Sequence, residues 1–500
     1  MDYSALSLLV PIFVIVMVLV TRKVALSLLL GILIGGIIIY YPSPLSILSY
    51  SYEKISSVFY SVEEGALAIN FGSLYIFAFL IMLGFLSQIM LYSGAINAFV
   101  GLARTRVKTP QGSELVSFIA GIIIFIDDYF NALTVGQISK SLNDANKSSR
   151  ERLAYIIDST SAPICILVPI SSWGAYILGI INANDGLLLL IDSIWSNYYA
   201  WFALLGVFLT IIWQINLRPM QKNVNVNVKD VFQDSNTLKQ SSIWLLILPI
   251  LVLIISILLM IFWSGYQGIS SKPLTFINIL ASTDTSLSLF YGGLITLIFS
   301  FLISFRFIPF SSYKLIFING ISSMMPAIII LILAWAIGPV IKDDMKTGLY
   351  LASLSKEFLS NEFISLLPAI LFLFSAFIAF ATGTSWGTFA ILIPIALDLA
   401  TSNNGSPSLY ISSILAGAVF GDHSSPMSDT TILSATGAGC LVQSHFITQL
   451  PYVFSIAFIS LLSFIICSFA GIFGGYVFGI ISLIALFWFY SKYKSKPLII

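Results

Sequence analysis

The sequence predicts an all-α protein that crosses a membrane many times. Its residues are 58% hydrophobic and only 9% charged, and the mean hydropathy is +0.99, whereas roughly a quarter of the residues in a soluble domain are charged. Apolar runs of about 20 residues recur along the chain, and a helix of that length crosses roughly 30 Å of hydrocarbon. Spanning strands would show ten-residue alternation instead. We therefore predict a multi-pass helical protein of the cytoplasmic membrane, in contact with lipid.

Charge and cysteine usage exclude several other classes of protein. The formal net charge is +1 and the chain has no long basic stretch, so we expect no nucleic-acid partner. The three cysteines are scattered in apolar surroundings and form neither a disulfide framework nor a metal-binding spacing. The sequence contains no hydrolase or protease motif in a context that would support such an activity. It also lacks the G-x-x-x-x-G-K-S/T loop of ATP-binding proteins. We therefore expect no enzyme activity and no cofactor.

Lysine and arginine collect in cytoplasmic loops, and their positions orient the chain. Arg22 and Lys23 follow the first apolar run, which places that loop inside and the N-terminus outside. Two further predicted helices, at about 24–41 and 69–92, lead out and back to a second basic loop. We assign residues 1–112 to an N-terminal group of scaffold helices.

An apolar stretch at 114–139 is basic on both flanks, and a single crossing would leave one flank outside. The economical interpretation is a re-entrant hairpin that enters and leaves on the cytoplasmic side, with its tip near Asp127 to Asn131. Non-helical backbone at this depth is tolerated only where protein shields it or where it lines a wet cavity. The chain then crosses outward along a helix that we expect to be broken at Pro163, because proline removes a helical hydrogen bond. Residues 113–181 form this first hairpin and broken helix of a transport domain.

The middle of the chain, residues 182–360, is predicted to hold more scaffold helices around a polar cytoplasmic linker at 217–241. Residues 182–194 contain no lysine or arginine and are expected to form an outer loop. The four predicted helices lie at about 195–216, 242–264, 286–304 and 321–341. They carry the chain to the exterior before the second half begins.

A second polar-tipped apolar stretch opens the range 361–441 and is too long for one ordinary span. We interpret it as a hairpin that enters from the exterior, with Gly383 and Gly387 giving the backbone freedom for a tight tip. A crossing segment follows, which we expect to be broken at Pro426. The range 442–500 then supplies two C-terminal helices that end in the cytoplasm.

The charge pattern thus predicts about eleven crossings and two re-entrant hairpins, with hairpin and broken helix repeated in opposite orientations. Such an inverted repeat is the architecture of alternating-access secondary transporters, which bind their substrates near the bilayer midplane. The match between "DSTSAP" at 158–163 and "DHSSPMSD" at 422–429 agrees with this interpretation.

Five aspartates lie in polar clusters at the expected depth of the membrane centre: Asp127, Asp128, Asp158, Asp422 and Asp429. A carboxylate there costs about 2.5 to 3.5 kcal/mol on insertion scales, so five uncompensated ones would exceed the stability of a typical domain. The polar clusters contain no lysine or arginine as a partner. Protons, water or a bound cation remain, and Na+, as a hard cation, favours carboxylate, hydroxyl and carbonyl oxygens. We therefore predict Na+ at Asp158 and Asp422, in exchange for protons.

The wider set of predicted cation- and proton-binding residues surrounds these carboxylates. Besides the five aspartates it consists of Asn131, Ser159, Thr160, Thr384, Ser385, His423, Ser425 and Thr430. Asp127 and Asp128 point about 100° apart on a helix, so only one faces the site easily, and the alternative is a cap at the hairpin tip. Asp429 could instead cap a second half-helix. Trp173 and Trp386 follow hydroxyl pairs in "SSWG" and "TSWG", where they either border the site or pack beside small residues.

Four further polar residues allow more than one interpretation. His423 is either a pH sensor or a hydrogen-bond clamp. His445 is expected at the cytoplasmic end of the crossing, without a special role. Arg150 and Arg152 are expected to be topology determinants at the membrane interface, with Asp144 as an alternative partner.

The sequence resembles the NhaC family of Na+/H+ antiporters, which also includes malate and lactate exchangers. Five strings within residues 121–439 carry the resemblance: "FIDDYFNALTVG", "YIIDSTSAP", "PISSWGAY", "GTSWGTFAILIPI" and "FGDHSSPMSDTTILSATGAG". Ser424 stands where a cysteine is common in that family, and the oxygen-bearing residues are intact. The resemblance implies an ion-transporter-superfamily fold, in which a scaffold domain forms a homodimer and a transport domain of two hairpins and two broken helices moves like an elevator.

We therefore expect a secondary transporter that exchanges Na+ for H+. The alternative is a Na+- or H+-coupled carrier of a small carboxylate or amino acid, of the malate/lactate type. Such a carrier needs a donor for the substrate carboxylate, and the polar clusters offer only helix N-termini, hydroxyls and Asn131. A channel would need a continuous polar pathway, and the paired interrupted segments favour a gated site instead.

Overall fold

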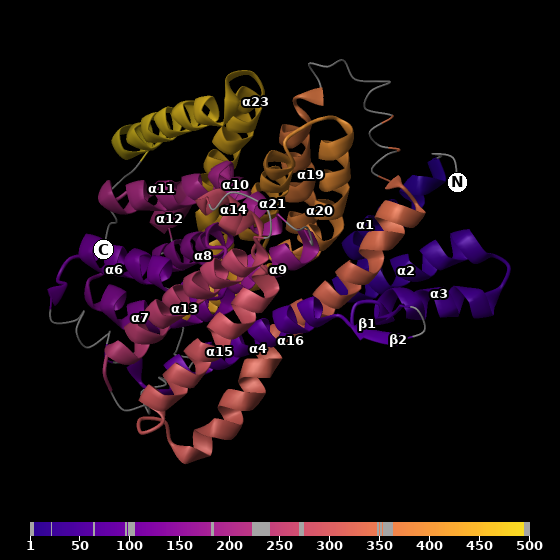
Figure 1. The fold of residues 1–500 in the computed structure, drawn as a ribbon. Coiled ribbons are helices and arrows are strands. Elements are labelled where there is room, and N and C mark those ends of the chain that lie inside the picture. The colour runs from indigo at the N-terminus through magenta and orange to yellow at the C-terminus, as the bar shows by residue number, and fades with distance from the viewer. Residues whose placement is uncertain are drawn as a thin grey trace.

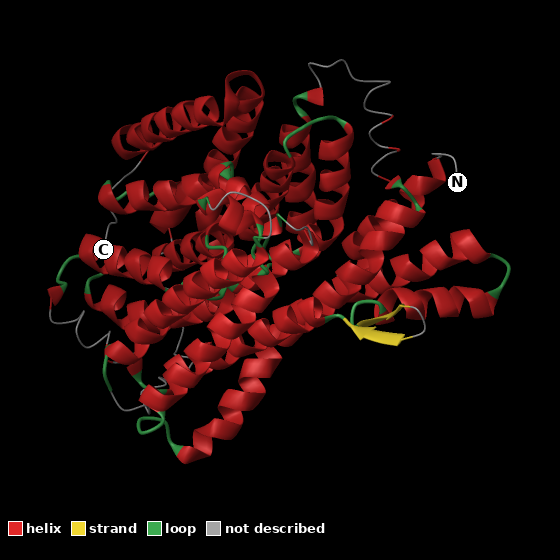
Figure 2. Cartoon of the chain, in the orientation of Figure 1, coloured by secondary structure: helices red, strands yellow, loops and turns green. Residues whose placement is uncertain are grey.

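The computed structural model describes residues 5–21, 23–63, 66–95, 98, 106–181, 185–222, 241–269, 275–347, 350, 353 and 364–494. Within these ranges the chain is almost entirely helical (Figure 2). The exception is one antiparallel pair of strands, β1 (Tyr60–Glu63) and β2 (Ala66–Ile69). Arg22 and most of the predicted linker at 217–241 lie outside the described residues.

Six described helical segments are long and apolar enough to cross a membrane, and two bent pairs of helices raise the number to eight. The six are α4 (Phe71–Tyr92), α13 (Trp244–Gly268), α15 (Thr285–Ser304), α16 (Tyr313–Pro339, within the segment Phe310–Asp344), α20 (Ser385–Ser402) and α23 (Val442–Phe489, within the segment Val442–Tyr493). The pairs are α8 (Arg150–Leu167) with α9 (Ser172–Ile181) and α10 (Gly186–Trp195) with α11 (Tyr198–Ile212), each bent by 44°. The prediction of a polytopic helical membrane protein is thereby confirmed.

The N-terminal part contains two short apolar helices and one helix that the sequence did not predict. The three are α1 (Leu9–Thr21), α2 (Val24–Tyr40) and α3 (Pro44–Ser56). In α3 the Ser43 hydroxyl caps the first turn and proline occupies the first helical position, which are both favourable at a helix start. Lys54 of α3 pairs with Asp344 at 2.8 Å, which ties this helix to the end of the α16 segment. The remaining short elements are η1 (Ala5–Leu8), α12 (Arg218–Lys222), α14 (Phe276–Ala281), η2 (Phe310–Ser312), η3 (Val340–Asp344) and η4 (Tyr490–Lys494).

Two helix pairs turn back on themselves at short tips. The first hairpin consists of α6 (Pro110–Ile123) and α7 (Asp128–Ala145), and the second of α19 (Leu367–Thr382) and α20. The first tip, at 124–127, lies a few residues before the predicted tip at Asp127 to Asn131 and shares only Asp127 with it, because Asp128 to Asn131 already belong to α7. The second tip consists of Gly383 and Thr384. Gly383 has a left-handed backbone (φ +70°), which glycine adopts without the strain that a Cβ would bring.

Each hairpin is followed by an interrupted helix. The first interruption, at 168–171, separates α8 from α9, and the second, at 424–428, separates α21 (Pro407–His423) from α22 (Asp429–Ala438). Pro426 lies in the second interruption, as predicted. The predicted break at Pro163 is wrong, because α8 continues through this proline to Leu167. The surrounding helices bury this turn completely, and such packing lets a membrane helix tolerate a missing hydrogen bond.

Two other segments bear on the predicted connections. Residues 186–195 form α10 instead of the predicted outer loop, because a lack of basic residues indicates the side of the membrane and not the backbone conformation. The long α23 is two helices joined at Gly471 (φ +69°), in agreement with the two C-terminal helices that the sequence predicts.

The helices form two groups that meet along α9, α16 and α20 (Figure 1). In one group α13, α15, α4 and α16 pack side by side, and in the other α6 to α8, α11, α21 and α22 surround the polar residues. Small residues allow close approach in both groups. Gly84 of α4 faces the carbonyl of Gly320 in α16, and Gly136 of α7 faces Gly437 of α22.

Candidate functional site

Each hairpin tip lies against the interruption of a helix. In the first half the Ser172 N–H, at the start of α9, donates to the Ile126 carbonyl in the hairpin tip at 2.9 Å. In the second half a Cβ on Gly383 would lie 2.7 Å from the Met427 carbonyl oxygen, just before α22. Three of the polar strings that drew attention in the sequence, 127–131, 382–388 and 421–431, therefore lie at or beside tips and interruptions, and the string 158–163 lies within α8.

Asp422 lies in the last turn of α21 and is bound by the second hairpin and the second interruption. Its Oδ2 accepts from the Ser385 hydroxyl at 2.8 Å and from the Ser385 N–H at 3.3 Å. Its Oδ1 accepts from the Ser428 hydroxyl. Asp422 is only 3% exposed. All three donors are neutral, so they stabilise an ionised carboxylate without balancing its charge.

Asp158 is fully buried in α8 and draws its donors from α22 and α23. Its Oδ2 accepts from Gln449 Nε2 at 3.0 Å, from His445 Nε2 at 3.1 Å and from the Thr431 hydroxyl at 3.3 Å. Its Oδ1 has no hydrogen-bond partner among the described residues. Two of the three donors are side-chain nitrogens, whereas both side-chain donors to Asp422 are hydroxyls.

The adjacent aspartates at the first tip differ in their surroundings. Asp127 is the N-cap of α7, accepting from the Phe130 N–H at 3.0 Å and from the Ser172 hydroxyl at 2.9 Å. Asp128 is 1% exposed, and neither carboxylate oxygen has a well-formed hydrogen bond in the described part of the chain, where the Trp173 indole N–H is a weaker side-chain donor to it. Of the pair, Asp128 is therefore the carboxylate with free oxygens, and Asp127 takes the role of the cap.

Five other predicted site residues shape the backbone near these carboxylates. The Asn131 amide donates to two carbonyls at the end of α6, both at 2.6 Å, and so closes the first tip. The Thr160 hydroxyl donates to the carbonyl four residues earlier in α8. Thr384 is the N-cap residue of α20 without a capping side-chain bond. The Ser425 hydroxyl accepts from an N–H of the second interruption at 3.3 Å, and the Thr430 hydroxyl bonds a neighbouring serine hydroxyl at 2.9 Å.

Two predicted roles at the second half need correction. Asp429 is exposed, so it does not belong to the buried carboxylates, and the cap of α22 is Ser428. Asp429 accepts from the Tyr129 hydroxyl at 3.0 Å in the first turn of α22, where negative charge is favourable. Gly387 lies inside α20 and not at the tip. A Cβ there would lie 2.6 Å from Val24 of α2, so this glycine permits close helix packing.

His423 links three helices through both ring nitrogens. Its Nδ1 bonds the Tyr199 hydroxyl of α11 at 2.9 Å, and its Nε2 bonds the Ser159 hydroxyl of α8 at 3.2 Å. Gln449 of α23 also donates to the His423 carbonyl at 2.8 Å. This is the geometry of a hydrogen-bond clamp.

The expectation that His445 has no special role is wrong. This histidine is fully buried and bonds Asp158. His445 and Gln449 are four residues apart on α23, and this spacing places both side chains on one helix face. A histidine and a glutamine four residues apart in an otherwise apolar helix were the sequence signal that could have revealed this role.

Arg152 is a buried cation and not an interfacial one. It is 1% exposed and contacts both carboxylate oxygens of Glu114, at 2.6 and 2.8 Å. It also donates to carbonyls at the C-terminal end of α11, where positive charge is favourable. The interfacial prediction for Arg152 fails because a bidentate carboxylate and these carbonyls replace its water. Arg150 pairs with Asp144 at 3.3 Å, in line with the alternative partner.

Comparison with known proteins gives the family. Residues 164–469, more than half of the chain, match the Na+/H+ antiporter family. An uncharacterized protein of Haemophilus influenzae is 36% identical over 486 residues, which cover 93% of this chain and 91% of that protein. The chain belongs to the Na+/H+ antiporter family. It is a secondary transporter and not an enzyme, and the resemblance to the NhaC family is confirmed.

More distant relatives and solved structures agree with this assignment. An uncharacterized Na+/H+ antiporter of Haemophilus influenzae is 32% identical over 131 residues, 25% of this chain and 26% of that protein. The malate-2H+/Na+-lactate antiporter of Bacillus subtilis is 32% identical over 135 residues, 26% of each chain. MtrF of Neisseria gonorrhoeae, from a class of antimetabolite efflux pumps, has a TM-score of 0.55 at 14% identity, covering 94% of both chains. The YdaH transporter of Alcanivorax borkumensis has a TM-score of 0.53 at 13% identity, covering 85% of this chain and 89% of its own. At these identities the two structures show the fold alone.

Sequence reasoning missed several groups that bind the carboxylates of this Na+/H+ antiporter-family member. They are Ser172, Ser428, Thr431, His445 and Gln449. Ser428 and Thr431 lie inside the polar string "SPMSDTT", so their hydroxyls were visible as candidates. In the described residues, the hydrogen bonds to Asp127, Asp158 and Asp422 come from Ser, Thr, Gln, His and backbone groups. A buried carboxylate in such surroundings can hold a proton or attract a cation.

Proposed function

We propose that this antiporter-family chain exchanges Na+ for H+ across the cytoplasmic membrane by alternating access, with Asp422 as its main ion-binding carboxylate. The observation that carries the proposal is that Asp422 is buried among neutral donors. A negative charge at this depth is costly, and a proton or a cation removes that cost. The hydroxyls of Ser385 and Ser428 have lone pairs that can turn toward a cation, and oxygen is the ligand that hard cations favour.

Competition for one carboxylate supplies the coupling. Na+ and H+ neutralise the same charge, so binding of one disfavours binding of the other. Moving the empty site through an apolar environment costs free energy, because its carboxylate is charged. A site that holds either ion is neutral and avoids this cost. Movement then requires an occupied site, and this requirement makes the exchange obligatory.

Asp158 and Asp128 complete the proposed ion pathway. The sequence predicts Na+ at Asp158 as well, and the unpartnered Oδ1 of Asp158 is the atom that supports this part of the proposal. Its Oδ2 is already occupied by N–H donors, which repel a cation. The free oxygens of Asp128 offer a further place for a proton or a cation.

We propose the following architecture for the exchange. The two hairpins are re-entrant and, with the interrupted helices, form a transport domain of residues 113–181 and 361–441. Scaffold helices at 1–112 and 182–360 and the C-terminal helices at 442–500 surround it, with about eleven crossings, an exterior N-terminus and a cytoplasmic C-terminus. The repeated order of hairpin and interrupted helix supports an inverted repeat. The family resemblance supports a homodimer formed by the scaffold.

A coupled carrier of a small carboxylate or amino acid is the second candidate. The 135 residues shared with the malate-2H+/Na+-lactate antiporter favour it. Against it stand the donors around the buried aspartates, which are hydroxyl, amide and imidazole groups already bonded to the protein. A substrate carboxylate would have to displace them or use a helix N-terminus.

Proteoliposomes that contain a pH-sensitive dye separate the two candidates. We expect addition of Na+ alone to change the internal pH, and addition of choline at equal ionic strength to leave it unchanged. A pH response that requires malate, lactate or an amino acid would transfer the assignment to the second candidate.

A further inference from the structure

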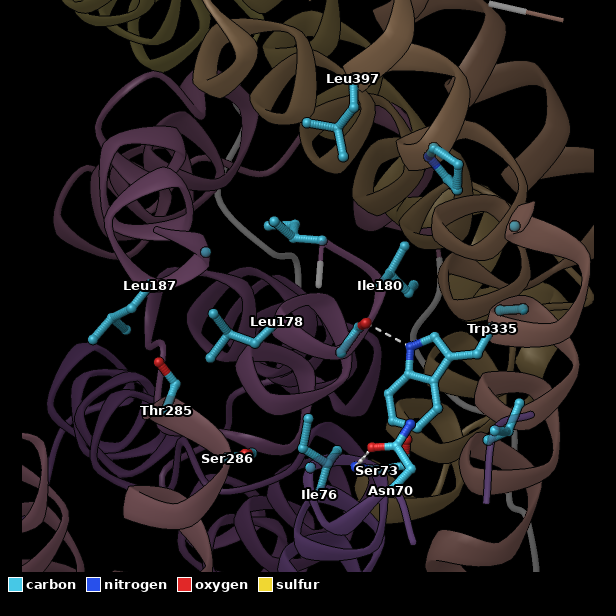
Figure 3. A pocket seen from close by; sticks show the side chains of 18 of the residues that line it. Asn70, Ser73, Ile76, Leu178, Ile180, Leu187, Thr285, Ser286, Trp335 and Leu397 are labelled. Carbon is cyan, nitrogen blue, oxygen red and sulfur yellow. Dashed lines mark hydrogen bonds between the residues drawn. The ribbon is translucent and has the colours of Figure 1, made fainter. Parts of the chain in front are cut away.

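A cavity of about 800 Å³ lies where the two groups of helices meet (Figure 3). Its walls include Ser73 of α4, Leu178 and Gly179 of α9, Trp335 of α16 and Leu397 of α20. The Trp335 indole N–H donates to the Gly179 carbonyl at 2.5 Å, which joins α16 to α9 across one wall. The cavity also has exposed side chains in its lining, those of η3, so it reaches the surface of the protein.

The loops that line this cavity all belong to one side of the membrane. They precede α4, connect α9 to α10, connect α13 to α15 and follow α16. Counting the crossings from the basic cytoplasmic loops places each of these connections outside. The cavity is therefore an outer vestibule in the proposed topology.

Two helices lead from the vestibule to the buried carboxylates. Along α9, seven residues separate Gly179 in the cavity wall from Ser172, which binds Asp127, and this is about 10 Å of helix. Along α20, twelve residues separate Leu397 in the wall from Ser385, which binds Asp422, and this is about 18 Å. The carboxylates thus lie at the inner ends of the same two helices whose outer ends form the vestibule.

Four aromatic side chains fill the space between α9 and α20 at the intermediate positions. Trp386 contacts Trp173 at 5.4 Å and Tyr176 at 4.6 Å between ring centroids, and Phe389 contacts Trp173 at 5.5 Å. The Tyr176 hydroxyl donates to the Trp386 carbonyl at 2.9 Å. These side chains are at most 6% exposed, and none of them lines the cavity. A continuous aromatic cluster therefore stands between the vestibule and the carboxylates.

We propose that Trp173, Tyr176, Trp386 and Phe389 form the outer gate of the ion pathway, closed in this conformation. This proposal rests on the proposed function in one respect: it takes Na+ and H+ as the particles that the gate holds back. Aromatic rings suit a gate because they exclude water over a large area, and their contacts are individually weak enough to separate. Trp386 is the central gate residue because it contacts two aromatic rings of α9. It also lies one residue after Ser385, which donates a hydrogen bond to Asp422.

The native Cys165 provides a reporter on the inner side of the gate. It is fully buried in α8, and its thiol contacts the Phe125 carbonyl in the first hairpin tip. We would replace Cys440 and Cys467 by serine and add a positively charged, membrane-impermeant methanethiosulfonate to right-side-out membrane vesicles. The rate of Cys165 modification then reports access through the gate and requires no transport measurement.

We expect Trp386→Ala to speed Cys165 modification by roughly 4- to 100-fold, because two ring contacts are lost and each shifts a closed–open equilibrium by about two- to tenfold. Trp335→Ala is the matched control, because it removes an indole from the vestibule wall without opening the gate, and it should leave the Cys165 rate unchanged. In a Cys165→Ser background, Leu397→Cys should be modified rapidly with or without the gate substitution.

Three results would overturn the gate. They are fast modification of Cys165 behind intact aromatics, equal acceleration by the Trp386 and Trp335 substitutions, and protection of Leu397→Cys from the external reagent. If Trp386→Ala does not give a monodisperse protein, Phe389→Ala takes its place, and an unchanged Cys165 rate in that variant counts against the proposal. If the wild-type protein shows no Na+/H+ exchange, the proposed function is refuted. The labelling rates would still test the gate, because they require no transport measurement.

Discussion

The two units of hairpin and interrupted helix resemble each other in backbone but hold their carboxylates with different chemistry. In the second unit, Asp422 is bound by Ser385 of its own hairpin and by Ser428 of its own interruption. In the first unit, Asp158 lies well before the interruption and takes its donors from the other half, including His445 and Gln449 of α23. The second site is therefore self-contained, whereas the first is completed by neighbouring helices.

The base of the first unit differs from the second as well. A buried ion pair between Arg152 and Glu114 ties α6 and α8 to the end of α11. Among the ion pairs that lysine and arginine form in the described residues, it is the one in which both side chains are buried. The comparison indicates that the first unit is anchored to its neighbours, while the second keeps its carboxylate among small hydroxyl donors that can reorient around an ion.

The largest effect is expected from Asp422→Asn. The asparagine keeps the size of the side chain and removes the charge that Na+ and H+ share, so we expect the apparent affinity for Na+ to fall by at least roughly 30-fold. Dye-loaded proteoliposomes give the measurement. Asp144→Asn, at an exposed aspartate that pairs with Arg150, is the control and should transport normally. Exchange at the wild-type level in Asp422→Asn would show that the second unit does not hold the ion.

The next largest effect concerns the anchor of the first unit. Arg152→Met leaves Glu114 buried without its partner, and we expect the free energy of unfolding to fall by about 3 to 5 kcal/mol. Thermal unfolding of the purified protein in detergent measures the loss. Arg150→Met removes a more exposed pair and should cost about 1 kcal/mol or less. Equal melting temperatures for the two variants would mean that the first unit is not anchored by this pair.

A pair of serine substitutions compares the hydroxyl donors of the two units. Ser385→Ala removes a hydrogen bond to Asp422, and a bond to a charged group contributes about 1.5 to 3 kcal/mol, so the Na+ concentration for half-maximal exchange should rise at least about tenfold. Ser172→Ala removes the corresponding bond to Asp127, which retains the Phe130 N–H. We expect a much smaller change in that variant. The reverse order would assign the ion to the first tip.

The smallest effect is expected at the second hairpin tip. Gly383→Ala forces a Cβ into a left-handed backbone and toward the Met427 carbonyl oxygen, so stability should fall by about 1 to 2 kcal/mol. Gly338→Ala is the matched control, because a Cβ there meets no atom within 4 Å, and alanine favours a helix. Denaturation in detergent compares the two. A neutral Gly383→Ala variant would show that this tip moves freely against the second interruption.

The elements that follow from local rules were predictable from the sequence. Helices α2, α4, α13 and α15 lie within a few residues of their predicted ranges, because about 20 apolar residues in a row have one stable backbone in lipid. The first hairpin was found from its basic flanks, with its tip placed a few residues too late, and Gly383 was found from the turn that it permits. Ser385 and Asp422, at a tip and beside an interruption, were found as polar residues in an apolar setting.

Other features depend on packing between helices and could not be predicted from local sequence. α8 passes through Pro163 because its neighbours enclose it, and the apolar segment at 186–195 is helical although its charges indicate only an outer location. His445 was assigned to the cytoplasmic end of a crossing from its place after an apolar segment, and Arg152 to the membrane interface from the rule that basic residues mark cytoplasmic loops. Their actual partners, Asp158 and Glu114, are distant in sequence.

The sequence by itself determined that this chain is a helical membrane transporter with acidic residues at depth, because hydropathy and the cost of buried charge act on each segment separately. The tertiary structure alone decided which donors meet which carboxylate, and hence that Asp422 lies among hydroxyls and Asp158 among nitrogens. Hydrogen bonds require atoms within about 3 Å of one another, and such proximity arises only after distant helices have packed.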